Sequence, residues 1–182
     1  MAFIEKEQMV ANEYIAKTRA YLDYLEEHIE NIRLAFQEVS KACDGMMWVG
    51  DDCTWHGLRQ EVCNHDISKF SKEEFTQYRA KFFTTLGEQQ EGFEYLRDFD
   101  KAWEHHKEAN HHHCETVDEE EFGHIGTIEK NVVHMIIDWT AMGYKFGDTA
   151  QEYYEANKDS IAVEPKLIPF MYKVFNKIKE VK

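Results

Sequence analysis

Ten histidines are the most unusual feature of this 182-residue sequence, and several lie at helical spacing from apolar residues. His28 follows Leu25 by three residues, and His106 follows Trp103 by three. Residues three or four apart share one face of a helix, so His106 is predicted to point inward and His28 to border the apolar, inward face of its helix. An imidazole is a general base and a metal ligand, and it is costly to bury without a partner.

The same spacing brings further histidine and aspartate side chains to inward faces. His65 and Asp66 follow Val62 by three and four residues, and Asp138 follows Met135 by three. Four predicted helices thus each carry a histidine or an aspartate toward the interior. A shared divalent cation would compensate such groups. The alternative is that each is a hydrogen-bonded core residue or lies at a partly exposed helix edge.

The elements that position these residues are predicted to be helices. A first helix is indicated by apolar residues at gaps of three and four, and it ends near residues 44–45: Leu22, Leu25, Ile29, Ile32, Phe36 and Val39. Further helices are predicted around 55–62, from 72 on, over 93–110, over 127–142, after 148, and from Pro165 to Ile178. A Ser71–Glu74 capping box marks the start of the helix at 72, and Asp148 with Gln151 caps the helix that follows. Gly143 is the predicted stop of the helix over 127–142. No long segment alternates with period two. The predicted fold class is therefore all-α, a single domain over residues 1–182 with about six to seven helices.

Charge and composition exclude several classes of function. Twenty-one basic and 35 acidic side chains give a net charge of −14, which opposes binding to duplex nucleic acid or to an anionic membrane surface. The apolar runs are too short to span a membrane, and the N-terminus does not have the pattern of a signal peptide. The four cysteines form no Cys-x-x-Cys pair and are expected to be reduced thiols of a cytoplasmic protein.

The order His28, His65-Asp66, Asp138 resembles the H…HD…D signature of the HD-domain superfamily of metal-dependent phosphohydrolases. The segment His65-Asp66-Ile67-Ser68-Lys69-Phe70 is similar to the HD-x-[GS]-K segment of many members. A small family of phages and bacteria with the motif HDxSKF resembles this sequence more closely. The resemblance is carried by the segment His65–Phe70 together with Ala102-Trp103, the histidines of 105–113 and Asp138-Trp139. The resemblance extends over residues 20–160 and implies an HD-like helical bundle.

The resemblance also implies a ligand set. It assigns one metal to four residues, with Asp66 bridging to a second metal: His28, His65, Asp66 and Asp138. For the second metal our choice is His106 and His112, with His105 and His113 as alternates. The second-metal histidines of the superfamily usually lie farther apart in the sequence than these do. The cofactor is expected to be one or two divalent ions, and imidazole and carboxylate ligands suit Mn, Fe, Mg, Co, Ni and Zn alike.

The activity implied is hydrolysis of a nucleotide or another small phosphate ester by metal-bound hydroxide. Asp66 would orient the water, and Lys69, four residues after His65, would neutralise phosphoryl charge as a catalytic and substrate-binding residue. Arg79 is a further candidate to bind the same anion. The alternative for Lys69 is that it interacts with the carbonyl groups at a helix C-terminus, and the alternative for Arg79 is that it is a surface charge. His134, one turn before Asp138, is expected at the surface. The competing functions are an HD-type di-iron oxygenase and a non-catalytic, metal-stabilised binding module.

Overall fold

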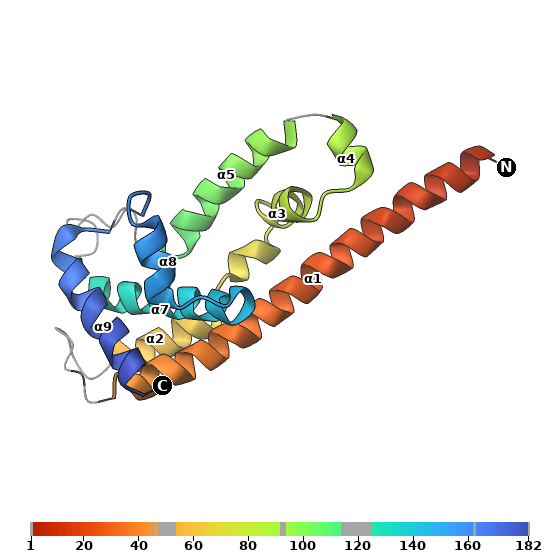
Figure 1. Ribbon diagram of the computed structural model, residues 1–182. Helices are drawn as coiled ribbons and strands as arrows, with labels where there is room; N and C mark the ends of the chain where they lie inside the picture. Colours follow the sequence, from red (N-terminus) through yellow and green to blue (C-terminus); the bar gives the residue numbers. More distant parts are fainter. Residues whose placement is uncertain are drawn as a thin grey trace. The chain divides into compact units, whose positions relative to one another are not determined.

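The computed structural model describes residues 2–44, 46, 54–91, 94–113, 125–161 and 163–181. Their regular structure is helical, with no strand among them, which confirms the predicted all-α class (Figure 1). The α-helices are α1 (Ala2–Ala42), α2 (Thr54–Cys63), α3 (Phe75–Phe82), α4 (Leu86–Glu91), α5 (Glu94–Ala109), α7 (Ile125–Phe146), α8 (Ala150–Asn157) and α9 (Ile168–Glu180), and the short 3₁₀ helices are η1 (Ile67–Phe70) and η3 (Pro165–Leu167). The described part of the chain thus has eight α-helices, one more than the upper predicted number, and the additional one is the short α4.

The contacts of the chain divide it into two compact units. Unit 1 contains residues 1–27 and 66–110, and unit 2 contains residues 28–65 and 111–182. The chain passes between the units three times, and α1 contributes to both. Each unit has an apolar cluster of its own. The prediction of one domain over residues 1–182 stays a prediction.

The larger apolar core belongs to unit 2, and α7 contributes its longest buried run, residues 131–137. Two polar residues, Asn131 and His134, fall within that run. Met171, Val174 and Ile178 of α9 are buried in the same core, and their gaps of three and four residues place them on one face of the helix. Removal of this apolar surface from water stabilises the unit by roughly 25 cal/mol per Å².

The core of unit 1 is smaller and largely aromatic. Tyr21 of α1 packs on Phe75 and Phe83, with ring centroids 5.3 and 5.7 Å apart. Tyr78 of α3 meets Phe99 of α5 edge-on at 5.2 Å. Tilted and edge-on contacts are the arrangements that aromatic pairs favour. This packing carries the hydroxyl groups of Tyr21 and Tyr78 into the interior of unit 1.

The buried stripe of α1 differs from the predicted stripe at every second position, by one residue each time. Leu22 and Ile29, predicted to face inward, are 41 % and 43 % exposed. The observed stripe has alternating gaps of four and three residues and consists of Tyr21, Leu25, His28, Ile32, Ala35 and Val39. Tyr21, His28 and Ala35 thus take the places that we assigned to Leu22, Ile29 and Phe36. His28 lies within the buried stripe and not at its border.

α7 continues through Gly143, which we predicted as its stop. The glycine permits a close approach, because a Cβ atom at position 143 would lie 2.2 Å from the backbone oxygen of Asp148. The helix ends at Phe146 and is followed by Gly147 at φ +87°, a left-handed conformation that favours glycine.

The N-cap of α8 lies one residue later than predicted. Thr149 accepts a hydrogen bond from the backbone of Glu152, and the Glu152 carboxylate accepts one from the backbone N–H of Thr149. This is a reciprocal capping box, so the predicted pair of Asp148 and Gln151 is wrong by one position.

Two expectations about the environment of the chain concern membranes and thiols. None of the described helices combines the length and the apolarity that a bilayer crossing requires. Among the described residues, Cys43 and Cys63 carry free thiols, as we expected.

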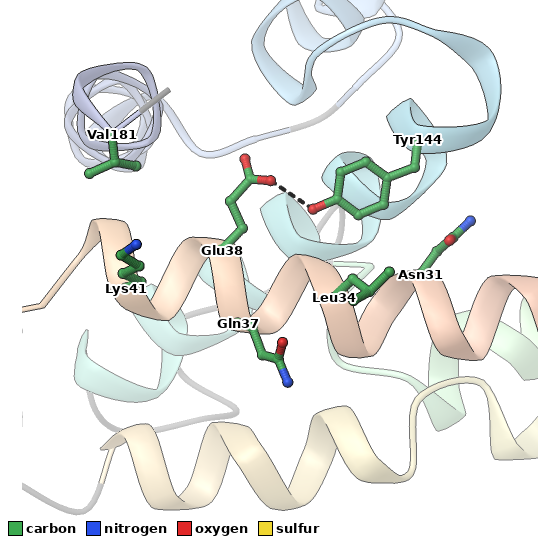
Figure 2. Close-up of a pocket in the computed structure, with 7 residues that line it drawn as sticks. All are labelled: Asn31, Leu34, Gln37, Glu38, Lys41, Tyr144 and Val181. Atoms are coloured by element: carbon green, nitrogen blue, oxygen red, sulfur yellow. Dashed lines mark hydrogen bonds between the residues drawn. The ribbon is translucent and has the colours of Figure 1, made fainter.

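A surface groove of about 560 Å³ lies beside the C-terminal half of α1 in unit 2 (Figure 2). Figure 2 shows the Tyr144 side chain directed at Glu38 of α1, and the hydroxyl donates to the carboxylate at 2.7 Å. The groove is lined by none of the predicted site residues.

Candidate metal centre

Three predicted ligands meet within unit 2: His28 of α1, His65 just after α2, and Asp138 of α7. The Nε2 atoms of His28 and His65 lie 3.1 Å apart. Oδ1 of Asp138 lies 3.4 Å from Nε2 of His28 and 3.6 Å from Nε2 of His65. Both histidines are buried, and Asp138 is half-buried. We call these three residues the metal triangle.

The spacing of the metal triangle fits a divalent cation. Metal–ligand bonds of about 2.0–2.2 Å place neighbouring ligand atoms roughly 3–3.5 Å apart. Two ring nitrogens that face each other need a proton or a cation between them, because their lone pairs repel. Two imidazoles and a carboxylate are ligands that several divalent ions accept. The cluster can therefore hold a metal ion, whose identity these ligand types leave open.

The surroundings of Asp138 favour its charged form. Burial by itself would raise the pKa of this carboxyl, but the hydrogen bond with His65 and positive charge on His65, His28 and His112 hold the pKa well below its usual range. A cation among the same histidines acts in the same direction. Asp138 is therefore an anionic ligand at neutral pH.

His134 is buried, so our expectation of a surface residue is wrong. Its Nε2 atom lies 3.1 Å from Nδ1 of His65. Its Nδ1 atom lies 4.0 Å from Oε2 of Glu61, and Glu61 also forms an ion pair with Lys130. A proton on Nδ1 of His65, donated to His134, leaves the lone pair of Nε2 for the metal triangle. His134 is thus placed to hold His65 in the tautomer that metal binding requires.

His112, predicted as a ligand of the second metal, is buried in unit 2 and packs against His65 in a tilted arrangement with ring centroids 4.3 Å apart. His65, His112 and His134 each offer a ligand atom within 4.8 Å of the other two. The alternate His113 is half-buried, with its ring 4.2 Å from that of His112. These imidazoles adjoin the metal triangle through His65. The pairing of His112 with His106, a residue of unit 1, stays a prediction.

Asp66 belongs to unit 1 and has an unusual backbone conformation. Its φ of 58° and ψ of 17° are left-handed, and it is the one non-glycine residue with a positive φ in the described part of the chain. This conformation costs an L-residue roughly 1–2 kcal/mol, less for aspartate and asparagine. The turn at Asp66 leads the chain into η1. Backbone strain of this kind is concentrated at functional sites.

The Asp66 carboxylate lies between two basic side chains of unit 1. Nζ of Lys69 lies 2.5 Å from Oδ2, and Nε2 of His106 lies 3.2 Å from Oδ1. Burial by itself would lower the pKa of His106, but its hydrogen bonds to Asp66 and Glu74 raise the pKa above its ordinary value. His106 is fully buried, as its helical spacing predicted.

Glu74 was not among the predicted site residues, yet it is fully buried and binds two of the histidines. Its Oε1 accepts from Nδ1 of His105 at 2.7 Å, and its Oε2 accepts from Nδ1 of His106 at 2.8 Å. Burial by itself would raise the pKa of Glu74, but hydrogen bonds from His106, His105 and Ser68 lower it. Because Nδ1 of His106 is held by Glu74, Nε2 is directed at Asp66.

These bonds explain why the predicted Ser71–Glu74 capping box is absent. α3 begins at Phe75 and not at residue 72, and Glu74 makes no capping hydrogen bond. The Ser-x-x-Glu pattern is a signal for a helix start. The same glutamate has a second use that the local pattern does not reveal, because its histidine partners lie 31 and 32 residues away.

Arg79, predicted to bind substrate, is held by Glu88. The guanidinium donates to both carboxylate oxygens of Glu88 and lies 4.3 Å from the ring centroid of Tyr14. Arg79 is 1 % exposed. It therefore connects α1, α3 and α4 within unit 1, and we leave it out of the proposed reaction.

The predicted site residues are distributed over both units. Unit 2 holds His28, His65, His112, Asp138 and the alternate His113, and unit 1 holds Asp66, Lys69, Arg79, His106 and the alternate His105. Asp66 follows His65 directly in the sequence. Its part as the fourth ligand of the metal triangle stays a prediction.

The fold and the site define an all-helical protein with buried histidine and aspartate groups that can hold a metal ion. The chain belongs to the family of unknown function DUF5662, whose model matches residues 17–178. That match includes every predicted site residue. Comparisons with curated proteins and with solved structures give no match. The relation to the HD-domain superfamily stays a prediction.

Proposed function

We propose that this protein is a metal-dependent phosphohydrolase that acts on a nucleotide or another small phosphate ester. The observation that carries the proposal is the metal triangle, in which two imidazole nitrogens and a carboxylate oxygen lie 3.1–3.6 Å apart inside unit 2. The ordered set His28, His65-Asp66, Asp138 adds the resemblance to metal-dependent phosphohydrolases.

The residues that would hold the cation are His28, His65 and Asp138, with Asp66 as the further ligand expected from the sequence. A divalent cation there supplies Lewis acidity and makes a water acidic enough to act as a nucleophile near neutral pH. Asp138 contributes negative charge, and His134 keeps the His65 ring in the correct tautomer.

Two residues of unit 1 have properties that suit phosphoryl chemistry. Lys69 is a buried ammonium, and such a charge stabilises phosphoryl oxygens more strongly than an exposed one does. Asp66 has the strained backbone that functional residues often show. In this proposal Asp66 orients the water, and Lys69 binds the phosphoryl group of the substrate.

The first test is metal content followed by phosphate release. Protein purified without added metal is analysed for bound elements, and we expect at least one divalent ion per chain. The protein is then assayed for phosphate release from nucleotides and sugar phosphates with each of several divalent ions. His28→Asn is expected to lose the ion and the activity together. His56→Asn, a change at an exposed histidine of α2, is the matched control and is expected to lose neither.

Lys69→Met separates substrate binding from metal binding. It removes the ammonium but keeps the length of the side chain, so the metal is retained while turnover falls by about 10²–10³. Lys72→Met, at the exposed residue one turn later, is the control. Equal turnover of Lys69→Met and the parent would remove Lys69 from the reaction.

Other results of the metal analysis and the phosphate-release assay would favour one of the two competing functions. Bound iron with oxygen-dependent turnover and no phosphate release would replace the proposal by an oxygenase. Bound metal without turnover of any tested ester would support a metal-stabilised binding module. Absence of bound metal together with full phosphatase activity would leave the metal triangle without the role that we give it.

A further inference from the structure

Two tyrosine hydroxyls in the core of unit 1 lack hydrogen-bond partners among the described residues. Tyr21 is 1 % exposed and Tyr78 is 5 % exposed, so neither hydroxyl is hydrated from the surface. A buried hydroxyl without a partner is unfavourable, because it has lost its bonds to water and gained none. Such a group in a folded protein indicates a water, an ion or a ligand that completes its hydrogen bonds.

Both tyrosines belong to the aromatic core of unit 1, whose members Tyr78 and Trp103 pack against His106 of the charged cluster. Burial first, and then the negative charges of Asp66 and Glu74, raise the pKa of both phenols. The ring of Tyr78 lies 5.5 Å from that of His106 and 5.3 Å from Nζ of Lys69. At neutral pH the two hydroxyls are therefore protonated and able to donate hydrogen bonds beside this cluster.

The neighbouring carboxylates already have donors. Oδ2 of Asp66 accepts from Lys69, Oδ1 of Asp66 forms an ion pair with Nε2 of His106 at 3.2 Å, and the oxygens of Glu74 accept from His105 and His106. The tyrosine hydroxyls make no hydrogen bond to any of these four oxygens. Their acceptor is thus to be sought outside the described side chains.

We propose that the hydroxyls of Tyr21 and Tyr78, together with the ammonium of Lys69, form a subsite that binds the phosphoryl oxygens of the substrate. This assignment rests on the proposed phosphohydrolase function. Two neutral donors and one cation match an acceptor that is rich in oxygen and negatively charged. The ammonium disfavours a metal ion as the occupant of the subsite. Neutral donors also add no further charge to a cluster whose acids and bases are already paired.

Tyrosine to phenylalanine substitutions test the subsite, because they remove only the hydroxyl. Inorganic phosphate is titrated calorimetrically into the full-length, Mn²⁺-loaded parent and into Tyr21→Phe, Tyr78→Phe and the double variant. Each single variant is expected to bind phosphate about tenfold more weakly. Tyr144→Phe is the matched control: it also removes a hydroxyl, but that hydroxyl is bonded to Glu38, and phosphate affinity is expected to stay unchanged.

The melting temperature of the same variants without phosphate gives a second readout of opposite sign. Removal of an unsatisfied buried hydroxyl relieves an unfavourable burial, so Tyr21→Phe and Tyr78→Phe are expected to melt at the same temperature as the parent or up to roughly 2–4 °C higher. If instead an ordered water satisfies the hydroxyl and stabilises the fold, the variant is expected to melt at a lower temperature than the parent. A lower melting temperature together with unchanged phosphate binding would overturn the subsite.

The failure of the subsite and the failure of the proposed function are distinguishable. If the parent hydrolyses phosphate esters and the phenylalanine variants keep its KM, the subsite is wrong and the function stands. If the parent binds phosphate through these hydroxyls but hydrolyses no ester, the function is wrong and the subsite stands. A parent that binds no phosphate at millimolar concentration also overturns the subsite.

Discussion

The two polar clusters of this protein are similar in composition but opposite in arrangement. In unit 2 the two Nε2 atoms of His28 and His65 face each other, and Oδ1 of Asp138 lies 3.4 and 3.6 Å from them. In unit 1 basic and acidic groups alternate in the order Lys69, Asp66, His106, Glu74, His105. The first arrangement needs a proton or a metal ion between its ring nitrogens, whereas the second balances its own charges.

This difference indicates which solution condition controls the stability of each unit. Imidazoles that face one another are favourable only with a proton or a metal between them, so the stability of unit 2 is expected to depend on metal. Alternating acids and bases are stable as long as they are ionised, so the stability of unit 1 is expected to depend on pH. The predictions below test this contrast, and the largest expected effect comes first.

Removal of metal is expected to have the largest effect. A ligand bound to the folded state at about 1,000 times its Kd adds about 4 kcal/mol, so chelation is expected to lower the melting temperature by roughly 10 °C. His28→Asn should abolish this shift, whereas Glu74→Gln, in the unit 1 cluster, should keep most of it. Differential scanning calorimetry with and without chelator measures both. If chelation lowers the melting temperature of His28→Asn as much as that of the parent, the stability of unit 2 does not depend on metal bound at the metal triangle.

Acid is expected to weaken unit 1 through the Arg79–Glu88 pair. The hydrogen bond from Arg79 lowers the pKa of Glu88 to about 2, against about 4.3 in an unfolded chain. Because the folded pKa is depressed, this stabilisation is fully present above about pH 4.3 and is lost as the pH falls toward about 2. It amounts to at most about 2–3 kcal/mol.

Glu88→Gln should remove that pH dependence. The variant is expected to be less stable than the parent at pH 7, and the gap between the two should narrow steadily below pH 4. Urea denaturation of the chelated proteins at pH 7, 5 and 3 measures the effect without a contribution from metal release. A constant gap over this range would show that the ion pair is not responsible.

His134 is expected to act on metal affinity through His65. Loss of a hydrogen-bond partner of a ligating histidine typically weakens metal binding by about 10–100-fold. His134→Phe keeps a ring but removes the acceptor for Nδ1–H of His65, and His134→Gln keeps an acceptor. We expect the phenylalanine variant to bind metal more weakly than the glutamine variant, as measured by competition with a chromogenic chelator. Equal affinities would mean that His134 contributes only packing.

The smallest effect concerns the backbone at Asp66. Asparagine tolerates the left-handed conformation better than alanine does, so metal-free Asp66→Asn is expected to be more stable than metal-free Asp66→Ala by about 1 kcal/mol. Both variants lack the carboxylate charge, and their difference combines the backbone term with the hydrogen bonds and packing that the asparagine amide retains. Equal free energies of unfolding would show that the turn relaxes at no cost. Asp66→Asn is therefore the variant to use when the carboxylate alone is to be tested.

The sequence by itself determined the all-α class and the inward position of His28, His106 and Asp138. Helical periodicity explains this success, because gaps of three and four residues fix which side chains share a face. The adjacency of His65 and Asp66 and the family resemblance added the order of the ligands. Local signals for helix ends were less reliable, as Gly143 shows: its small size serves the close approach of Asp148 and does not end the helix.

Only the tertiary structure decided which partner each polar side chain meets. Glu74 bonds to His105 and His106 and not to a helix N-terminus, Arg79 bonds to Glu88, and His134 is buried beside His65. Periodicity fixes the face on which a residue lies but not the element that covers that face. His134 and Glu74 gained their roles from residues 69 and about 30 positions away, and a local pattern carries no information about such distant partners.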